Sequence, residues 1–124
     1  MSIKDEYAVI LKQRLKENGI DDAPDYYETS PTINAEITLF TRDLRETVRF
    51  LDNDCTAEQL IWLSEVFEEI SAKLQSWEFI DALKRAADKY TEESNNYHIR
   101  DFITFAEGQL NDEVYRQRYP DFGK

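Results

Sequence analysis

The sequence predicts an all-α protein, a single domain of about five antiparallel helices spanning residues 1–124. Its length is that of one ordinary domain with one core. It has only three glycines and three prolines, too few for the many turns of a β fold. Apolar residues recur at helical spacing, and no long stretch alternates with a period of two. Together these observations favour helices throughout.

The first predicted helix covers residues 2–18. Ser2 and Asp5 have the spacing of a capping box, and Gly19 follows where a left-handed cap belongs. We expect a non-helical acidic loop at about 19–33. The apolar stripe of the first helix consists of Ile3, Tyr7, Ile10, Leu11 and Leu15.

Four further helices are predicted, at 34–52, 56–74, 76–90 and 97–110. Thr56 with Gln59 forms a capping box, Ser76 can cap the next helix, and the polar segment 92–96 is expected to be a loop. The apolar tail from Val114 onward should pack against the body. Short connections favour antiparallel neighbours, either as a compact bundle or as a short α-solenoid-like stack of helix hairpins. No clear sequence repeat separates these two arrangements.

Several kinds of protein are disfavoured by residue counts. Cys55 is the lone cysteine and His98 the lone histidine, so no intramolecular disulfide, cysteine-based metal site or histidine triad is expected. Residues 1–6 lack the apolar core of a signal peptide, and no apolar run has the length of a membrane span. We therefore expect a cytoplasmic protein without a cofactor.

The net charge of −11 points to a basic protein as partner. Phosphate neutralisation supplies most of the affinity of nucleic-acid binders, so direct binding to nucleic acid is not expected. An anionic membrane would also repel the chain. The alternative is that the acidity serves only solubility.

The acidic residues are concentrated in two windows that contain no lysine or arginine, 17–41 and 50–72. A surface adapted only for solubility usually intersperses the two signs. The windows hold twelve carboxylates: Glu17, Asp21, Asp22, Asp25, Glu28, Glu36, Asp52, Asp54, Glu58, Glu65, Glu68 and Glu69.

A helical wheel of 56–74 places Glu58, Glu65 and Glu69 opposite the apolar stripe, with Trp62 on the same outward side. A tryptophan among carboxylates suits an anchor in a protein interface. The alternative is that this helix is central, which would leave Trp62 buried.

The predicted loop repeats this combination, with Tyr26 and Tyr27 among carboxylates. Such a segment suits charge-assisted contacts with a basic cleft, and its alternative is a solvated connector. The predicted partner-binding residues are Asp21, Asp22, Asp25, Tyr26, Tyr27, Glu28, Asp52, Asp54, Glu58, Trp62, Glu65 and Glu69.

One pattern resembles the magnesium site of the all-α nucleotide pyrophosphohydrolases, whose four carboxylates hold Mg²⁺ against substrate phosphates. It is E-x-x-E followed by E-x-x-D, formed by Glu65, Glu68, Glu78 and Asp81. The nine residues between its halves are fewer than that family generally has, and E-x-x-E arises easily in acidic helices. This enzyme is a second alternative, and we expect a binding protein instead.

The stretch from Phe50 to Phe105, a little under half of the chain, resembles small helical immunity proteins of bacterial contact-dependent growth inhibition and related polymorphic toxin systems. The resemblance lies in FLDND at 50–54, TAEQLIWLSEVF at 56–67 and SWEFI at 76–80. It implies a 1:1 complex in which the chain neutralises one cognate toxin domain. Many such toxins are nucleases with a basic cleft, which an acidic surface would match. The first alternative is a helical-repeat adaptor whose acidity is incidental.

Overall fold

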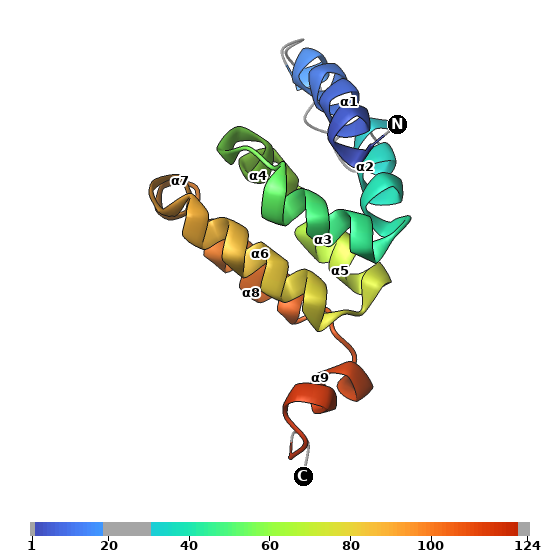
Figure 1. Ribbon diagram of the computed structural model, residues 1–124, viewed down its shortest axis with the longest axis vertical. Coiled ribbons are helices and arrows are strands. Elements are labelled where there is room, and N and C mark those ends of the chain that lie inside the picture. Colours follow the sequence, from blue (N-terminus) through green and yellow to red (C-terminus); the bar gives the residue numbers. More distant parts are fainter. Residues whose placement is uncertain (1, 19–30, 122–124) are drawn as a thin grey trace.

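The structure, a computed structural model, describes residues 2–18 and 31–121, and these parts of the chain are helical with no strand (Figure 1). The all-α prediction is confirmed, whereas the predicted number of about five helices is too low. The helices are α1 (Ile3–Asn18), α2 (Pro31–Thr41), α3 (Leu44–Asn53), α4 (Ala57–Leu63), α5 (Phe67–Leu74), α6 (Trp77–Lys89), α7 (Thr91–Asn96), α8 (Ile99–Glu107) and α9 (Asp112–Arg118), with a 3-10 turn η2 (Ser64–Val66) between α4 and α5.

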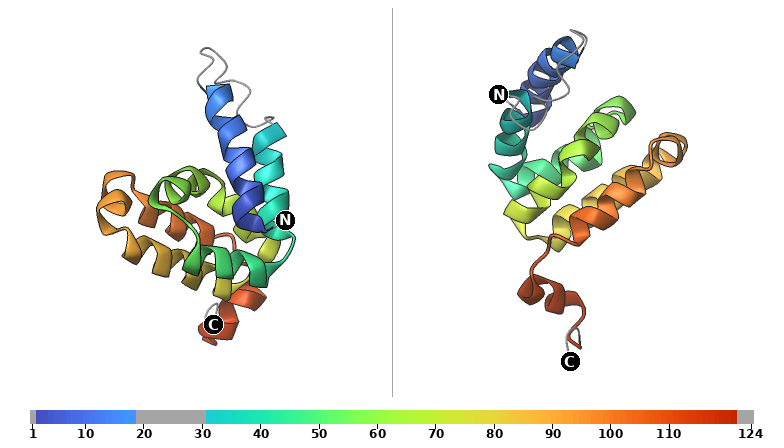
Figure 2. Two further views of the ribbon diagram at one scale, coloured as in Figure 1. Left: turned by 45° about the horizontal axis from the view of Figure 1, so that its top comes forward. Right: turned by 180° about the vertical axis from the view of Figure 1, so that it is seen from behind.

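The helices form a short stack of hairpins in two layers. One layer contains α1, α3 and α6, and the other contains α2, α5 and α8, with neighbours in contact along each layer (Figures 1 and 2). The pairs α1–α2 and α6–α8 also pack across the layers. Helices α4 and α7 fill the turns of the second and third hairpins and contact each other. The described helices thus form a compact all-helical arrangement in which hairpins lie side by side.

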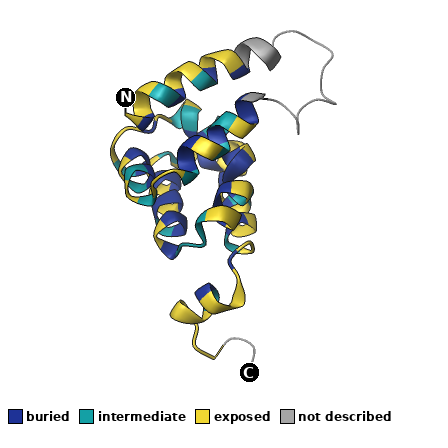
Figure 3. Ribbon diagram, turned by 90° about the vertical axis from the view of Figure 1, so that its right-hand side faces the viewer, coloured by how far each residue is buried: buried dark blue, intermediate teal, exposed yellow. Residues whose placement is uncertain are grey.

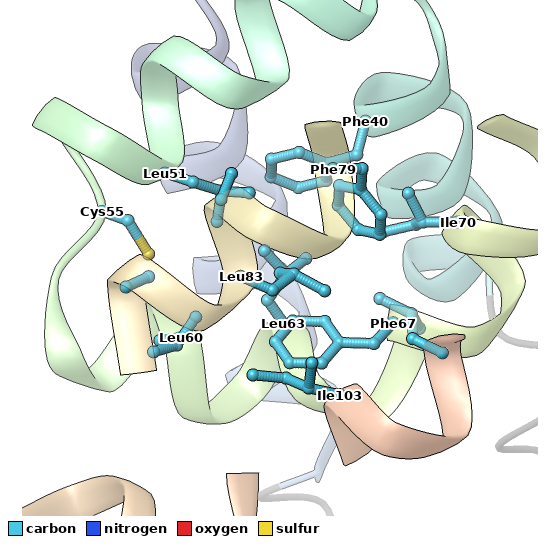
Figure 4. Packing of buried hydrophobic residues seen from close by; sticks show 14 of the residues in the cluster. Phe40, Leu51, Cys55, Leu60, Leu63, Phe67, Ile70, Phe79, Leu83 and Ile103 are labelled. Atoms are coloured by element: carbon cyan, nitrogen blue, oxygen red, sulfur yellow. The ribbon is translucent and has the colours of Figure 1, made fainter. Parts of the chain in front are cut away.

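The core runs between the two layers, where the apolar faces of the helices meet (Figure 3). Leu51, Phe67, Phe79 and Leu83 are among the fully buried side chains at its centre (Figure 4). At the α1–α2 end, the Tyr7 ring meets Phe40 edge to face with 5.0 Å between ring centroids. One apolar cluster therefore extends from α1 through the stack.

The helix predicted over 34–52 is broken at residues 42 and 43. Asp43 has extended backbone and accepts a hydrogen bond from the Glu46 N–H at 3.2 Å, so it caps a new helix. The Thr47 hydroxyl donates to the Phe40 carbonyl at 2.8 Å, which satisfies the end of α2. Helix α2 also starts earlier than expected, at Pro31, because proline suits the first helical position. Residues 31–33 are therefore helical, and the loop prediction was wrong for them.

Two further boundaries differ from prediction. The helix expected over 56–74 is interrupted by the 3-10 turn, where the Ser64 hydroxyl donates to the Ile61 carbonyl at 2.5 Å. The segment 92–96, expected to be a loop, belongs to α7. Its buried Ser94 hydroxyl donates to the Ala87 carbonyl at 2.9 Å, which holds this polar helix against α6.

The predicted helix starts are confirmed at three caps. Thr56 and Gln59 form a full capping box, Ser76 accepts from the Glu78 N–H, and Ser2 accepts from the Asp5 N–H. The cap expected at Gly19 lies outside the described residues. The apolar tail packs on the body as predicted, because Val114 is buried against Trp77. None of the described helices is long and apolar enough to cross a membrane.

Candidate partner-binding site

Half of the predicted partner-binding residues lie outside the described residues. These are the loop residues Asp21, Asp22, Asp25, Tyr26, Tyr27 and Glu28. The other six occupy one continuous part of the chain, from the end of α3 to the first turn of α5.

This region is joined to α1 and α2 by an ionic cluster around a buried pair, Arg14 and Glu36. Together with the half-buried Trp62 and the exposed Glu65 they are here named the Arg14 cluster. Arg14 of α1 donates through Nη1 to both carboxylate oxygens of Glu36 on α2, at 2.9 and 2.8 Å. The same nitrogen donates to the Trp62 carbonyl at 3.2 Å, and Nη2 pairs with Glu65 of η2. One arginine thus joins the α1–α2 hairpin to the α4–α5 segment.

The 3-10 turn leaves a backbone carbonyl available to the Arg14 cluster. The interruption of the helix at 64–66 takes the Trp62 carbonyl out of the regular i to i+4 ladder. That carbonyl instead accepts from the Ser64 N–H and from Arg14. Among the described residues, no buried side-chain nitrogen or oxygen lacks a hydrogen-bond partner.

Arg14 and Glu36 were not among the predicted site residues, although the sequence holds a signal for both. Arg14 follows Ile3, Tyr7 and Leu11 on the apolar stripe of α1. Glu36 likewise falls between the buried Ile33 and Phe40 on α2. A charged residue at a core position has to be paired, and two such positions on consecutive helices suggest each other as partners.

Burial also changes the acidity of the cluster. Removal from water raises the pKa of Glu36 to about 7, against the opposing effect of Arg14, and the charge of Glu65 raises this pKa further. The pKa of Tyr7 is raised too, mainly by burial and next by the charge of Glu36. The charge of the cluster therefore changes near neutral pH.

Trp62 is half-buried. Its exposure is therefore lower than the helical wheel predicted and higher than the alternative of a central helix implied. The Arg14 guanidinium carbon lies 5.3 Å from its ring centroid, which is cation–π distance. The tryptophan singled out as an anchor for a basic partner thus already contacts an arginine of its own chain.

Two of the predicted carboxylates are held by internal ion pairs. Asp52 accepts a two-pronged contact from Arg85 of α6 at 2.9 and 3.1 Å, and Lys89 donates to its carbonyl at 2.7 Å. Glu65 is held by Arg14. Both carboxylates fasten helices together, so they are less available to a partner.

Asp54, Glu58 and Glu69, here named the 54–69 carboxylates, are different. All three are exposed, and no ion pair or side-chain hydrogen bond connects them to another of the described residues. The predicted straight outward face is altered, because three residues of 3-10 turn add about 60° of rotation relative to an α-helix. Glu58 and Glu69 nevertheless both remain in solvent.

The E-x-x-E … E-x-x-D pattern is not assembled into one site. Asp81 is paired with Arg118 at 2.8 Å, and this hydrogen bond lowers the pKa of Asp81. Within the described parts of the chain, no three histidine, cysteine, aspartate or glutamate side chains are grouped to hold a metal ion. Cys55 is buried, and burial raises the pKa of its thiol to about 12, so it is not a reactive nucleophile.

Comparison of the chain with protein-family models, with curated proteins and with solved structures finds no match in any of the three. The described residues themselves show an all-α stack of helices with an exposed acidic segment.

Proposed function

We propose that this chain is a binding protein that neutralises a basic partner, and specifically an immunity protein for a toxin domain. The observation that carries the proposal is that the 54–69 carboxylates are exposed and form no ion pair with a described residue. They lie in the same stretch of chain as the half-buried Trp62. A carboxylate that no described cation neutralises remains attractive to lysine and arginine side chains of another protein.

The remaining charges favour the same kind of partner. Arg42, Lys84, Arg85, Arg100 and Arg118 all form ion pairs with carboxylates of other helices. With a net charge of −11, the uncompensated charge of the chain is negative. An acidic surface of this kind steers a basic protein into contact and speeds association at low salt.

The fold suits a scaffold for recognition. The Arg14 cluster connects α1 and α2 to the segment that bears Trp62, which fixes this side chain before a partner arrives. Pre-organised contacts lose less conformational entropy on binding. The resemblance of 50–105 to immunity proteins supports a toxin, most simply a nuclease with a basic cleft, as partner in a 1:1 complex. On this proposal the chain itself binds neither nucleic acid nor membrane.

A helical-repeat adaptor is the second candidate, favoured by the stack of hairpins in two layers. Such stacks present extended surfaces to partners and need no enzymatic site. The two candidates differ in stoichiometry and consequence, because an inhibitor holds one partner tightly and abolishes its activity.

The experiment is affinity capture from lysate of the source strain, at low salt and at about 0.5 M salt, where surface charge is screened. The immunity proposal expects one basic protein, retained near one to one at low salt and inhibited when the complex forms. Several weakly held proteins, with no loss of activity in any of them, would favour the adaptor.

A further inference from the structure

Helix α9 is attached to the stack differently from the other helices. It lies beyond the α6–α8 end, and most of its surface is exposed (Figures 1 and 3). Its connection to α8 is held by Gln75, which donates to the Gln109 carbonyl at 2.8 Å and accepts from the Asn111 N–H at 2.7 Å. Val114 is the one residue of α9 that is buried. The start of α9 is therefore fixed, while the helix itself adds little to the core.

Beneath α9 lies a site formed by Trp77 and Asp81 of α6, here named the Trp77 site. The Trp77 indole N–H donates to the Val114 carbonyl at 2.8 Å. Arg118 stacks on the indole, with its guanidinium carbon 4.4 Å from the ring centroid. Both of its terminal nitrogens donate to the Asp81 carboxylate at 2.8 Å. Tyr115 and Tyr119 surround the indole at centroid distances of 5.4 and 5.8 Å.

This geometry is that of arginine recognition. A planar guanidinium that meets a carboxylate with two parallel hydrogen bonds and an aromatic face at the same time distinguishes arginine from lysine. The neighbouring cations of α6 do not compete for Asp81, because Lys84 pairs with Glu107 and Arg85 pairs with Asp52. Trp77 is only 7% exposed beneath this cover. Without α9, a tryptophan and a carboxylate would face solvent together.

We propose that the Trp77 site binds an arginine-bearing segment of a partner protein, and that α9 occupies the site until such a segment displaces it. That the partner is basic rests on the proposed function, whereas the chemistry of the site rests on the contacts of Arg118. We expect displacement to leave the stack intact, because Val114 is the one buried residue of α9 and Tyr115 only packs against the edge of the core. The chain's own segment thus sets the affinity threshold that a partner must exceed.

The test uses the full chain and, as probe, a synthetic peptide with the sequence of residues 111–121. Binding is followed by NMR through the Trp77 indole N–H, with the Trp62 indole as an internal reference. The Arg118→Ala chain is expected to bind the peptide at least about tenfold more tightly than the natural chain, because its own competitor is weakened. Adding Asp81→Asn should abolish this gain, and a peptide that carries Arg118→Ala should not bind.

The matched control is Arg100→Ala, which removes an arginine–aspartate pair of the same length, 2.8 Å to Asp88, away from any tryptophan contact. It should bind the peptide like the natural chain. Equal binding to the natural and Arg118→Ala chains, binding that survives Asp81→Asn, or no binding at millimolar peptide would each overturn the proposal. Exchange of α9 between two copies, seen as a dimer of the natural chain in sedimentation, would overturn it in favour of a second copy as occupant.

Discussion

Arg14 and Glu36 form an ion pair in which Nη1 of Arg14 donates to both carboxylate oxygens, at 2.9 and 2.8 Å, and neither side chain is more than 2% exposed. They belong to the two helices of the N-terminal hairpin, and Arg14 extends the contact to Trp62 and Glu65. Burying two charges is costly, and their attraction offsets this cost only when the remaining polar atoms are satisfied. The Arg14 cluster meets that condition and adds a polar connection to the apolar contacts that hold the N-terminal hairpin on the stack.

Removing one partner of the buried pair should destabilise the fold strongly. Arg14→Met is expected to lower the free energy of unfolding by about 3–5 kcal/mol, because it leaves Glu36 buried without its counter-ion. The double variant Arg14→Met with Glu36→Leu should recover much of this loss. Urea unfolding of the two single variants and the double variant measures the coupling.

The matched control is Arg42→Met, which removes the exposed pair with Glu6 at 2.8 Å. This variant should change stability little, since solvent screens exposed charges. A loss for Arg14→Met no larger than that for Arg42→Met would show that the buried pair does not hold the hairpin.

Stability should fall with rising pH across the neutral range. Because burial raises the pKa of Glu36 from 4.5 to about 7, the folded chain keeps a proton that the unfolded chain has released. The contribution of Glu36 to the free energy of unfolding is complete below about pH 4.5 and is lost as the pH rises through 7. The change is on the order of 3 kcal/mol. The pKa values of Glu6 and Asp81 are lowered by Arg42 and Arg118, so these two residues change the stability only in more acidic solution.

Glu36→Gln isolates this effect, because glutamine keeps the shape and an acceptor oxygen but cannot titrate. Urea unfolding at a series of pH values from about 5 to about 8 should give a steeper decline for the natural chain than for Glu36→Gln. Parallel pH profiles would mean that Glu36 does not titrate in this range.

The break between α2 and α3 should depend on Asp43. Its carboxylate accepts from the Glu46 N–H at 3.2 Å and caps α3. Asp43→Ala is expected to cost about 1 kcal/mol, the usual effect of losing a cap, and Asp43→Asn should restore most of it. Thermal unfolding measures the stability of both variants. An Asp43→Ala chain as stable as the natural one would show that the Asp43 cap does not stabilise α3.

The sequence was a good guide to helix starts and a poor guide to helix interruptions. Thr56 and Ser76 act through residues two or three positions away, so the local pattern is sufficient to find them. The breaks at 42–43 and 64–66 occur where the apolar stripe continues without a glycine or proline. There the Thr47 contact to Phe40 and the Arg14 contact to Trp62 stabilise the broken form, and the second depends on tertiary packing.

The acidic segment was visible in the sequence, but its internal pairing was not. Asp52 and Glu65 stand in a window with no nearby cation, yet Arg85 and Arg14 reach them from helices distant in the chain. Spacing along the chain does not reveal such pairs. Of the five described carboxylates that were predicted as contacts, Asp52 and Glu65 form internal ion pairs, whereas Asp54, Glu58 and Glu69 form none with a described residue.

The most direct test of the central claim compares partner binding by two charge-reversed chains. One carries Asp54→Lys, Glu58→Lys and Glu69→Lys, and the control carries Asp5→Lys, Glu92→Lys and Asp101→Lys, exposed acids outside both the 54–69 segment and α9. Both changes alter the net charge by the same amount, and both chains should remain folded by circular dichroism.

Calorimetric titration with the basic protein captured from lysate gives the two dissociation constants. The proposal predicts that reversal of the 54–69 carboxylates weakens binding by at least about a hundredfold, or roughly 3 kcal/mol, while the control changes it little. Equal weakening by both chains would mean that only net charge matters. Unchanged binding by the first chain would contradict the assignment of this segment as the partner-binding site.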